Sequence, residues 1–172
     1  QTSDIPDIEM REDESQRNVV DLTDYFADWY VAGMNLAYSV EFCSNYSHVR
    51  PVIEGRNISI ELPTKDWYGT ETVRVNCSDG EFNATSRNIT VNVSSVNDPP
   101  IIAPLERLDV FEGNTTIFNI TPFLADIDTP VENLTVKADS PNCTMSGQNL
   151  TLLYTVGDVD ERIPFHVSNG EF

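Results

Sequence analysis

The stretch Asn88-Ile89-Thr90-Val91-Asn92-Val93-Ser94 decides the fold, because polar and apolar residues alternate in it without a break. A period of two places its three apolar side chains on one face and its four polar side chains on the other. This pattern predicts a β-strand with one buried face. The same alternation recurs in the stretches 57–62, 72–77 and 149–152. Turn-forming clusters such as Ser78-Asp79-Gly80 separate such stretches, so we predict an all-β, antiparallel chain.

The sequence also contains an internal repeat. Residues 22–28 match residues 120–126, and residues 78–82 match residues 168–172. The offset is 98 residues in the first match (120 − 22) and 90 residues in the second (168 − 78). A repeat of this length, with about seven short strands, has the size of an immunoglobulin-like sandwich.

We therefore predict two tandem immunoglobulin/cadherin-like antiparallel β-sandwich domains, at residues 1–97 and 98–172. The sequence stops at Phe172, before any counterpart of the strand at 88–94. We expect the second domain to lack its last strand and to leave a neighbouring strand edge unpaired. Three explanations stay open: the strand is truncated or disordered, it lies in a longer chain, or another molecule donates it by β-augmentation.

The charge balance is strongly acidic. The chain of 172 residues has 28 acidic and 10 basic residues and a formal net charge of −18. Such a charge repels nucleic acid and anionic membrane surfaces, and it favours solubility or the binding of divalent cations. No apolar stretch approaches the ~20 residues of a membrane-spanning helix, so we expect no membrane insertion in this fragment. Because Gln1 begins directly in polar sequence, we expect a mature fragment of a longer protein.

Asn-x-Ser/Thr sequons are far more frequent than chance predicts. With 15 asparagines and 28 serines and threonines among 172 residues, chance gives about 2.4 sequons (15 × 28/172). Alternating strands of Asn and Thr produce some of them, but asparagine is a poor strand former. We predict several N-linked glycans, and therefore an extracellular, cell-surface location. The eleven candidate sites are Asn45, Asn57, Asn76, Asn83, Asn88, Asn92, Asn114, Asn119, Asn133, Asn142 and Asn149.

Three strings carry a resemblance to a known family: Asp-Trp-Tyr-Gly-Thr-Glu-Thr at 66–72, Asp79-Gly80, and Val-Asn-Asp-Pro-Pro at 96–100. With them the chain resembles the tandem cadherin-like and immunoglobulin-like repeats of large prokaryotic, and by our prediction archaeal, cell-surface proteins. The resemblance covers essentially the whole chain. It implies domains joined end to end, with Ca²⁺ at the joints.

The same resemblance implies a set of calcium ligands. Ca²⁺ takes six to eight oxygen ligands, which carboxylates and carbonyls of two domains supply together. In the alternative interpretation Asp98 caps a turn and the acids of the second domain are ordinary loop residues. The first repeat reads Asp28-Trp29-Tyr30 and lacks the second acid of the pair. The implied ligands are Glu12, Asp66, Asn97, Asp98, Asp126 and Asp128.

Three cysteines are present, Cys43, Cys77 and Cys143. The third and sixth strands of an immunoglobulin-like sheet are neighbours, so the resemblance favours a Cys43–Cys77 disulfide. Cys143 has Val167 where its partner would stand, and it is either unpaired or paired beyond this fragment. In the alternative interpretation all three are small, buried apolar side chains.

No motif of a known catalytic class is present, and the two histidines, His48 and His166, form no metal-binding pair. We therefore expect no enzyme. The first hypothesis is a structural or adhesive repeat of a surface layer, filament or adhesin, in contact with neighbouring repeats or with other copies of itself. Two alternatives stay open: a non-catalytic spacer or binding module of a large secreted enzyme, and a strand-donating filament subunit.

Overall fold

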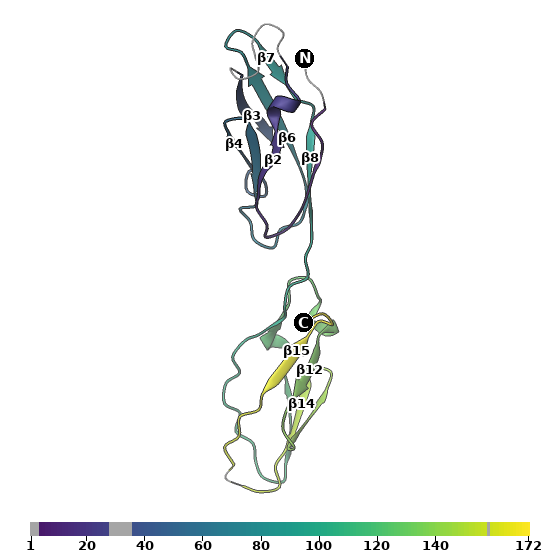
Figure 1. The fold of residues 1–172 in the computed structure, drawn as a ribbon. Helices are drawn as coiled ribbons and strands as arrows, with labels where there is room; N and C mark the ends of the chain where they lie inside the picture. The colour runs from purple at the N-terminus through teal and green to yellow at the C-terminus, as the bar shows by residue number, and fades with distance from the viewer. Residues whose placement is uncertain (1–3, 28–35, 158) are drawn as a thin grey trace. The chain divides into compact units, whose positions relative to one another are not determined.

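The computed structural model describes residues 4–27, 36–157 and 159–172. The chain divides into two compact units, Gln1–Val96 and Asn97–Phe172, which we call unit 1 and unit 2 and describe one at a time (Figure 1). Regular structure in the described residues consists of strands and three short 3₁₀ helices. The prediction of an all-β chain is therefore confirmed.

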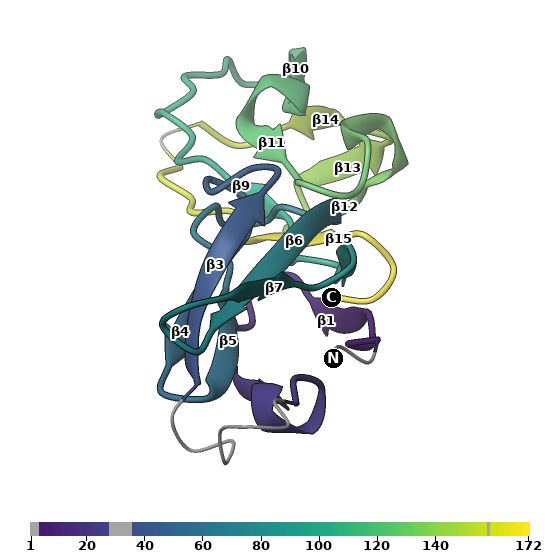
Figure 2. The ribbon, with the colours of Figure 1, turned by 90° about the horizontal axis from the view of Figure 1, so that it is seen from above.

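Unit 1 forms two sheets. In the first sheet the strand order is β1-β8-β6-β3, with β7 beside β6; in the second it is β2-β5-β4. Figure 2 shows β3, β6 and β7 side by side. In the part of unit 1 that the structure describes, one short helix, η1 (Leu22–Asp24), follows β2. The strands are β1 (Ile8–Arg11), β2 (Gln16–Asp21), β3 (Ala37–Cys43), β4 (Arg50–Glu54), β5 (Asn57–Glu61), β6 (Gly69–Ser78), β7 (Asn83–Thr85) and β8 (Ile89–Ser94).

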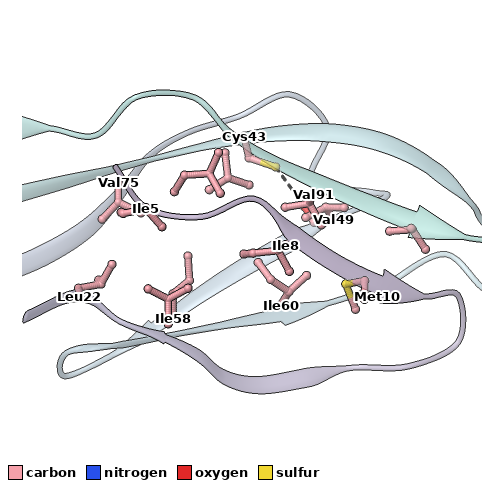
Figure 3. Packing of buried hydrophobic residues seen from close by; sticks show 14 of the residues in the cluster. Ile5, Ile8, Met10, Leu22, Cys43, Val49, Ile58, Ile60, Val75 and Val91 are labelled. Atoms are coloured by element: carbon pink, nitrogen blue, oxygen red, sulfur yellow. Dashed lines mark hydrogen bonds between the residues drawn. The ribbon is translucent and has the colours of Figure 1, made fainter. Parts of the chain in front are cut away.

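The core of unit 1 is made by the alternating faces of these strands. In β8, Ile89 and Val91 are completely buried and Val93 is nearly so, while Asn92 and Ser94 are exposed. Strand β5 behaves in the same way and contributes Ile58 and Ile60 from the other sheet. Figure 3 shows these isoleucines with side chains of β1 in one cluster. In β5 and β8 the apolar residues of the alternating sequence are therefore the buried ones.

Strand β1 departs from the antiparallel pattern. It pairs in parallel with β8, with Ile8 opposite Val91 and Arg11 opposite Ser94. The ladder continues for one bond beyond β1, because the backbone N–H of Glu12 donates to the carbonyl of Ser94 over 3.0 Å. The end of β1 is thereby held beside the end of β8.

Unit 2 contains shorter sheets. Their orders are β10-β14-β13, β12-β15 and β9-β11, and two helices, η3 (Thr121–Phe123) and η4 (Val131–Asn133), lie between strands. Its buried cluster is smaller and consists of Ile120, Leu124, Leu134, Val136, Leu150 and Leu152. The strands are β9 (Ile101–Ile102), β10 (Thr115–Asn119), β11 (Leu124–Ala125), β12 (Thr135–Ala138), β13 (Cys143–Ser146), β14 (Asn149–Leu153) and β15 (Phe165–Ser168).

The pairing of β15 differs from that of its counterpart in unit 1. By the sequence repeat, β15 corresponds to the end of β6, which pairs with β3, β7 and β8. Within the described part of unit 2, β15 pairs with β12. The assignment of both units to one immunoglobulin-like repeat stays a prediction.

The predicted Cys43–Cys77 disulfide is wrong. In the β3–β6 ladder Cys43 lies opposite Val73, whereas Cys77 lies opposite Tyr38. Four residues of strand, about 13 Å, therefore separate the two positions along the ladder. The Cα atoms of a disulfide lie within about 7 Å, so this register forbids the bond. Instead the Cys43 thiol donates to the carbonyl of Val49 over 3.1 Å, and burial raises the pKa of the Cys43 thiol.

Cys143 also forms no disulfide within the residues that the structure describes. It begins β13, where it lies opposite Leu152. Over the same described ranges, no helix is both long and apolar enough to cross a membrane.

Because Ile60 is completely buried between the two sheets of unit 1, its truncation leaves a cavity. Ile60→Ala is expected to lower the free energy of unfolding of unit 1 by about 2–5 kcal/mol. Both tryptophans, Trp29 and Trp67, belong to unit 1, so tryptophan fluorescence in a urea titration measures this change. The control is Glu61→Ala, one residue further along β5 and exposed, which is expected to change it by about 0.5 kcal/mol or less. Equal effects of the two substitutions would contradict the assignment of Ile60 to the buried face of β5 and of Glu61 to the exposed face.

Candidate functional site

The predicted ligands fall into two groups, one in each unit. Glu12 and Asp66 belong to unit 1, and the other four, Asn97, Asp98, Asp126 and Asp128, belong to unit 2. Asp28, the acid of the first repeat, lies outside the described residues. Each group also contains one side chain that the sequence alone did not indicate, Asp13 in unit 1 and Asn169 in unit 2.

In unit 1 the carboxylate of Glu12 is buried at the end of the β1–β8 ladder. The residue is only 2% exposed, and its Oε1 accepts a hydrogen bond of 2.5 Å from the backbone N–H of Val96. The second oxygen, Oε2, is also buried and has no hydrogen-bond partner among the residues that the structure describes. A buried carboxylate oxygen without a donor is costly, because ionisation in a dry environment needs compensation.

Asp13, the next residue, brings a second carboxylate to this end of unit 1. Its Oδ1 accepts a hydrogen bond of 3.0 Å from the backbone N–H of Asp66. The side chains of these two aspartates also offer carboxylate oxygens within 4.8 Å of each other. Both backbones are left-handed, with φ of 62° at Asp13 and 55° at Asp66, a conformation that aspartate tolerates better than most residues. Two negative charges this close repel each other unless a cation lies near them.

One cation of the chain already lies at this pair. The ammonium of Lys65 is 2.9 Å from Oδ1 of Asp66, but the Lys65 side chain is 77% exposed. The Asp66 side chain itself is only 14% exposed, so the carboxylate is largely buried while its partner charge lies in water, where it is partly screened. Glu12, Asp13 and Asp66 thus bring carboxylate oxygens to this end of unit 1. Carboxylate oxygens are the ligands that Ca²⁺ binds.

In unit 2, Asp126 is the centre of the second group. Its Oδ1 accepts hydrogen bonds from the backbone N–H groups of Asp128 (2.9 Å) and Thr129 (2.7 Å). The carboxylate of Asp128 in turn accepts a hydrogen bond of 2.8 Å from the backbone N–H of Asp98. Burial opposes the ionisation of Asp126, but the hydrogen bonds from Thr129, Asp128 and Asn169 outweigh it and lower the pKa of Asp126.

Asn169 completes this group. Its amide nitrogen Nδ2 donates to the backbone carbonyl of Asp98 (2.7 Å), to Oδ2 of Asp126 (3.0 Å) and to Oδ1 of Asn97 (3.3 Å). The side chain thus contacts three of the four predicted ligands of unit 2. We missed its role from the sequence, although the repeat aligns Asn169 with Asp79 and so indicated that the position matters.

The sequons differ in exposure. Asparagines at seven of the eleven sites are exposed: Asn83, Asn88, Asn92, Asn114, Asn119, Asn133 and Asn149. The other four, Asn45, Asn57, Asn76 and Asn142, are half-buried. At Asn142 the amide donates to Glu161 over 3.1 Å, and at Asn45 it lies 3.0 Å from Nδ1 of His48. A sugar would have to be accommodated around these contacts. The same holds at two exposed sites, because the amide of Asn92 donates to Glu9 over 2.9 Å and that of Asn119 donates to Oδ1 of Asn149 over 3.1 Å.

His48 belongs to a hydrogen-bonded cluster in unit 1. Its Nδ1 lies 2.8 Å from Oε1 of Glu71, and its ring stacks on Trp67 with centroids 4.4 Å apart. The other oxygen of Glu71 accepts a hydrogen bond from the hydroxyl of Ser44, so the carboxylate bridges Ser44 and His48. Nδ1 of the imidazole is therefore bonded to an acid, and the hydroxyl of Ser44 is bonded to the same carboxylate.

Comparisons with known proteins give no family. No family model and no curated protein matches the chain. A solved structure of a variant of the endo-fucoidan hydrolase MfFcnA4, from glycoside hydrolase family 107, matches 99% of this chain at 16% identity and a TM-score of 0.43. A second structure of MfFcnA4 matches 96% of it at 16% identity and a TM-score of 0.41. The chain spans about a quarter of the length of those structures (26% and 25%), and likeness at this level indicates neither family nor activity.

The lowered pKa of Asp126 predicts a dependence of stability on pH in unit 2. A carboxyl group whose pKa is lower in the folded state stabilises that state above its unfolded pKa, about 3.9, and the contribution is lost as the pH falls through the folded pKa. We expect the stability of unit 2 to fall over this acidic range and to fall less steeply in Asp126→Asn. Backbone amide NMR signals of unit 2, followed during unfolding at several pH values, measure this.

The control for this experiment is Asp109→Asn. The Asp109 side chain is 87% exposed and contacts Arg107 within its own loop. This substitution is expected to leave the slope of stability against pH unchanged. An Asp126→Asn chain with the slope of the native chain would contradict the assignment.

Proposed function

We propose that this chain is a structural or adhesive segment of an extracellular, N-glycosylated surface protein, built from cadherin-like and immunoglobulin-like repeats. In this proposal Ca²⁺ binds where the two units join and stiffens the joint. The chain would work mechanically, as a spacer in a surface layer, filament or adhesin. The ligand classes that this requires are carboxylates and carbonyls at the end of one unit and the start of the next.

The observation that carries the proposal is the buried carboxylate of Glu12. One of its oxygens is bonded to the backbone of Val96, the last residue of unit 1, and the other has no hydrogen-bond donor among the described residues. An unpartnered carboxylate oxygen that is excluded from water favours a cation as its missing partner. Its sequence neighbour Asp13, paired with Asp66, adds two more carboxylates to the same end of the unit.

Chain connectivity brings further oxygens to this end. Asn97 and Asp98 follow Val96 directly, and two trans peptide steps span at most about 7.6 Å between Cα atoms. The backbone of Asp98 therefore begins within reach of the residue to which Glu12 is bonded.

Charge and sequons support the surface location. A net charge of −18 keeps such a chain soluble, and divalent cations would offset part of the self-repulsion. The seven exposed sequon asparagines distribute over both units. Sugars on them would cover strand edges and hinder pairing between neighbouring molecules.

The calcium proposal predicts a stability difference that depends on Glu12 and Asp66. A ligand at 100 times its dissociation constant stabilises the folded state by about 2.7 kcal/mol, which for a unit of this size raises Tm by roughly 10 °C or more. Saturating CaCl₂ is expected to raise the Tm of the native chain by this amount relative to EDTA. Glu12→Gln and Asp66→Asn are expected to abolish most of the difference, measured by tryptophan fluorescence, which reports on unit 1.

Glu54→Gln is the matched control, because Glu54 is an exposed glutamate at the end of β4 in the same unit. It removes one negative charge without touching the candidate centre and is expected to keep the full effect of calcium. The proposal fails if chelator leaves the Tm of the native chain unchanged, or if Glu54→Gln reduces the effect as much as Asp66→Asn does.

A further inference from the structure

The side chain of Asn169 lies in a turn that fixes which way its amide points. The turn follows β15, and Oδ1 of Asn169 accepts hydrogen bonds from the backbone N–H groups of Glu171 (3.2 Å) and Phe172 (3.1 Å). Only an oxygen can accept these bonds, so the oxygen and the nitrogen of the amide cannot be exchanged. The NH₂ group must therefore face the opposite way.

On that side the NH₂ group meets three oxygens from two separate segments. They are the backbone carbonyl of Asp98, Oδ2 of Asp126 and Oδ1 of Asn97, at 2.7, 3.0 and 3.3 Å. The first and third belong to the start of unit 2, and the second to the loop after β11. One carboxylate, one carbonyl and one amide oxygen converging on a point form the donor set that a hard cation takes. In this chain the point is occupied by a neutral group with two polar hydrogens.

Unit 1 provides an internal comparison, because the matching turn has an aspartate. Oδ1 of Asp79 accepts hydrogen bonds from the backbone N–H groups of Glu81 (2.8 Å) and Phe82 (2.6 Å). A third hydrogen bond is also common to the two turns. The backbone N–H of Gly80 donates to the hydroxyl of Ser78, and that of Gly170 donates to the hydroxyl of Ser168. The turn thus forms equally well around a carboxylate. The two repeats differ at this position in the group that points away from the turn, an oxygen in one and an NH₂ in the other.

We propose that the amide of Asn169 takes the place of a divalent cation in unit 2, so that the cluster of Asn97, Asp98 and Asp126 is closed without metal. Asn169 is then a positioning residue, since it ties the first residues of unit 2 to the loop at Asp126 and to the turn after β15. Asn97 and Asp126 are not calcium ligands in the native chain. A carboxylate at position 169 would make the same cluster dependent on Ca²⁺.

This inference stands on contacts within unit 2 and does not need the proposed centre at Glu12 and Asp66. The test uses the full chain in the Asp66→Asn background, so that calcium binding in unit 1 does not contribute. Three variants are compared in EDTA and in millimolar CaCl₂: Asn169→Asp, Asn169→Ala and, as a control, Asn133→Asp. Asn133 is an exposed asparagine in η4, so the control adds one carboxylate to unit 2 outside the cluster.

In EDTA, Asn169→Ala is expected to lower the Tm of unit 2 by roughly 5–15 °C, because the contacts of the NH₂ group with three oxygens and the two turn hydrogen bonds to Oδ1 are lost. Asn169→Asp is expected to lower it further, since a carboxylate then faces three oxygens. Calcium should restore the Tm of Asn169→Asp and shift the backbone amide NMR signals of Asp128 and Thr129. Calcium should change neither the Tm of unit 2 nor these NMR signals in Asn169→Ala, in Asn133→Asp or in the chain that keeps Asn169.

Two results would overturn the proposal. The first is an Asn169→Asp chain that is as stable as its parent in EDTA or unresponsive to calcium. The second is a calcium-dependent shift of the Asp128 and Thr129 signals in the Asp66→Asn chain that keeps Asn169. If Asn169→Asp does not fold in EDTA, refolding on addition of CaCl₂ supports the proposal, and failure to refold contradicts it. Asn169→Ala separates loss of the amide from gain of the charge.

Discussion

The parallel pairing of β1 with β8 is the contact on which the candidate centre of unit 1 depends. A parallel strand at this edge runs in the same direction as β8, so both strands end at the same place. The hydrogen bond from the backbone N–H of Glu12 to the carbonyl of Ser94 then fixes the backbone of Glu12. The bond from the N–H of Val96 to Oε1 fixes the Glu12 side chain. An antiparallel β1 would carry Glu12 to the opposite end of the sheet. The burial of Ile8 and Met10 against the core is what keeps this pairing in register.

The two units handle concentrated negative charge in different ways. In unit 2 the carboxylate of Asp126 is surrounded by backbone N–H groups and by the amide of Asn169, which lower the pKa of Asp126 and keep the charge without a cation. In unit 1 the oxygens of Glu12 and Asp66 have fewer donors, and the nearby Lys65 is exposed. The two units differ in the number of N–H groups that donate hydrogen bonds to the carboxylates. For this reason we propose calcium for the acids of unit 1 and the Asn169 amide for the cluster of unit 2.

Much of the strand structure could be predicted from the sequence, because alternation has one physical cause. The face of β8 that carries Ile89, Val91 and Val93 is buried, as the pattern required. Register could not be predicted in the same way, since it depends on which residues of two strands face each other. The prediction of a Cys43–Cys77 disulfide was wrong for this reason. In the β3–β6 register, the residue opposite Cys43 is Val73, four residues before Cys77.

The candidate sites were predictable in part. Resemblance indicated Glu12 and Asp66, but the role of Asp13 arises from a left-handed backbone that a sequence pattern does not reveal. Asn169 was visible as the partner of Asp79 in the repeat. Its contacts with three oxygens could be seen only once the loops of unit 2 were folded together.

Glycopeptide mass spectrometry of the protein from its native source tests the central claim most directly. It measures the occupancy of each of the eleven sequons. A surface glycoprotein predicts sugars at several of the exposed asparagines, such as Asn88, Asn114 and Asn133. Unmodified asparagines at all eleven sites would contradict the proposed location and remove the main support for a sugar-coated surface protein.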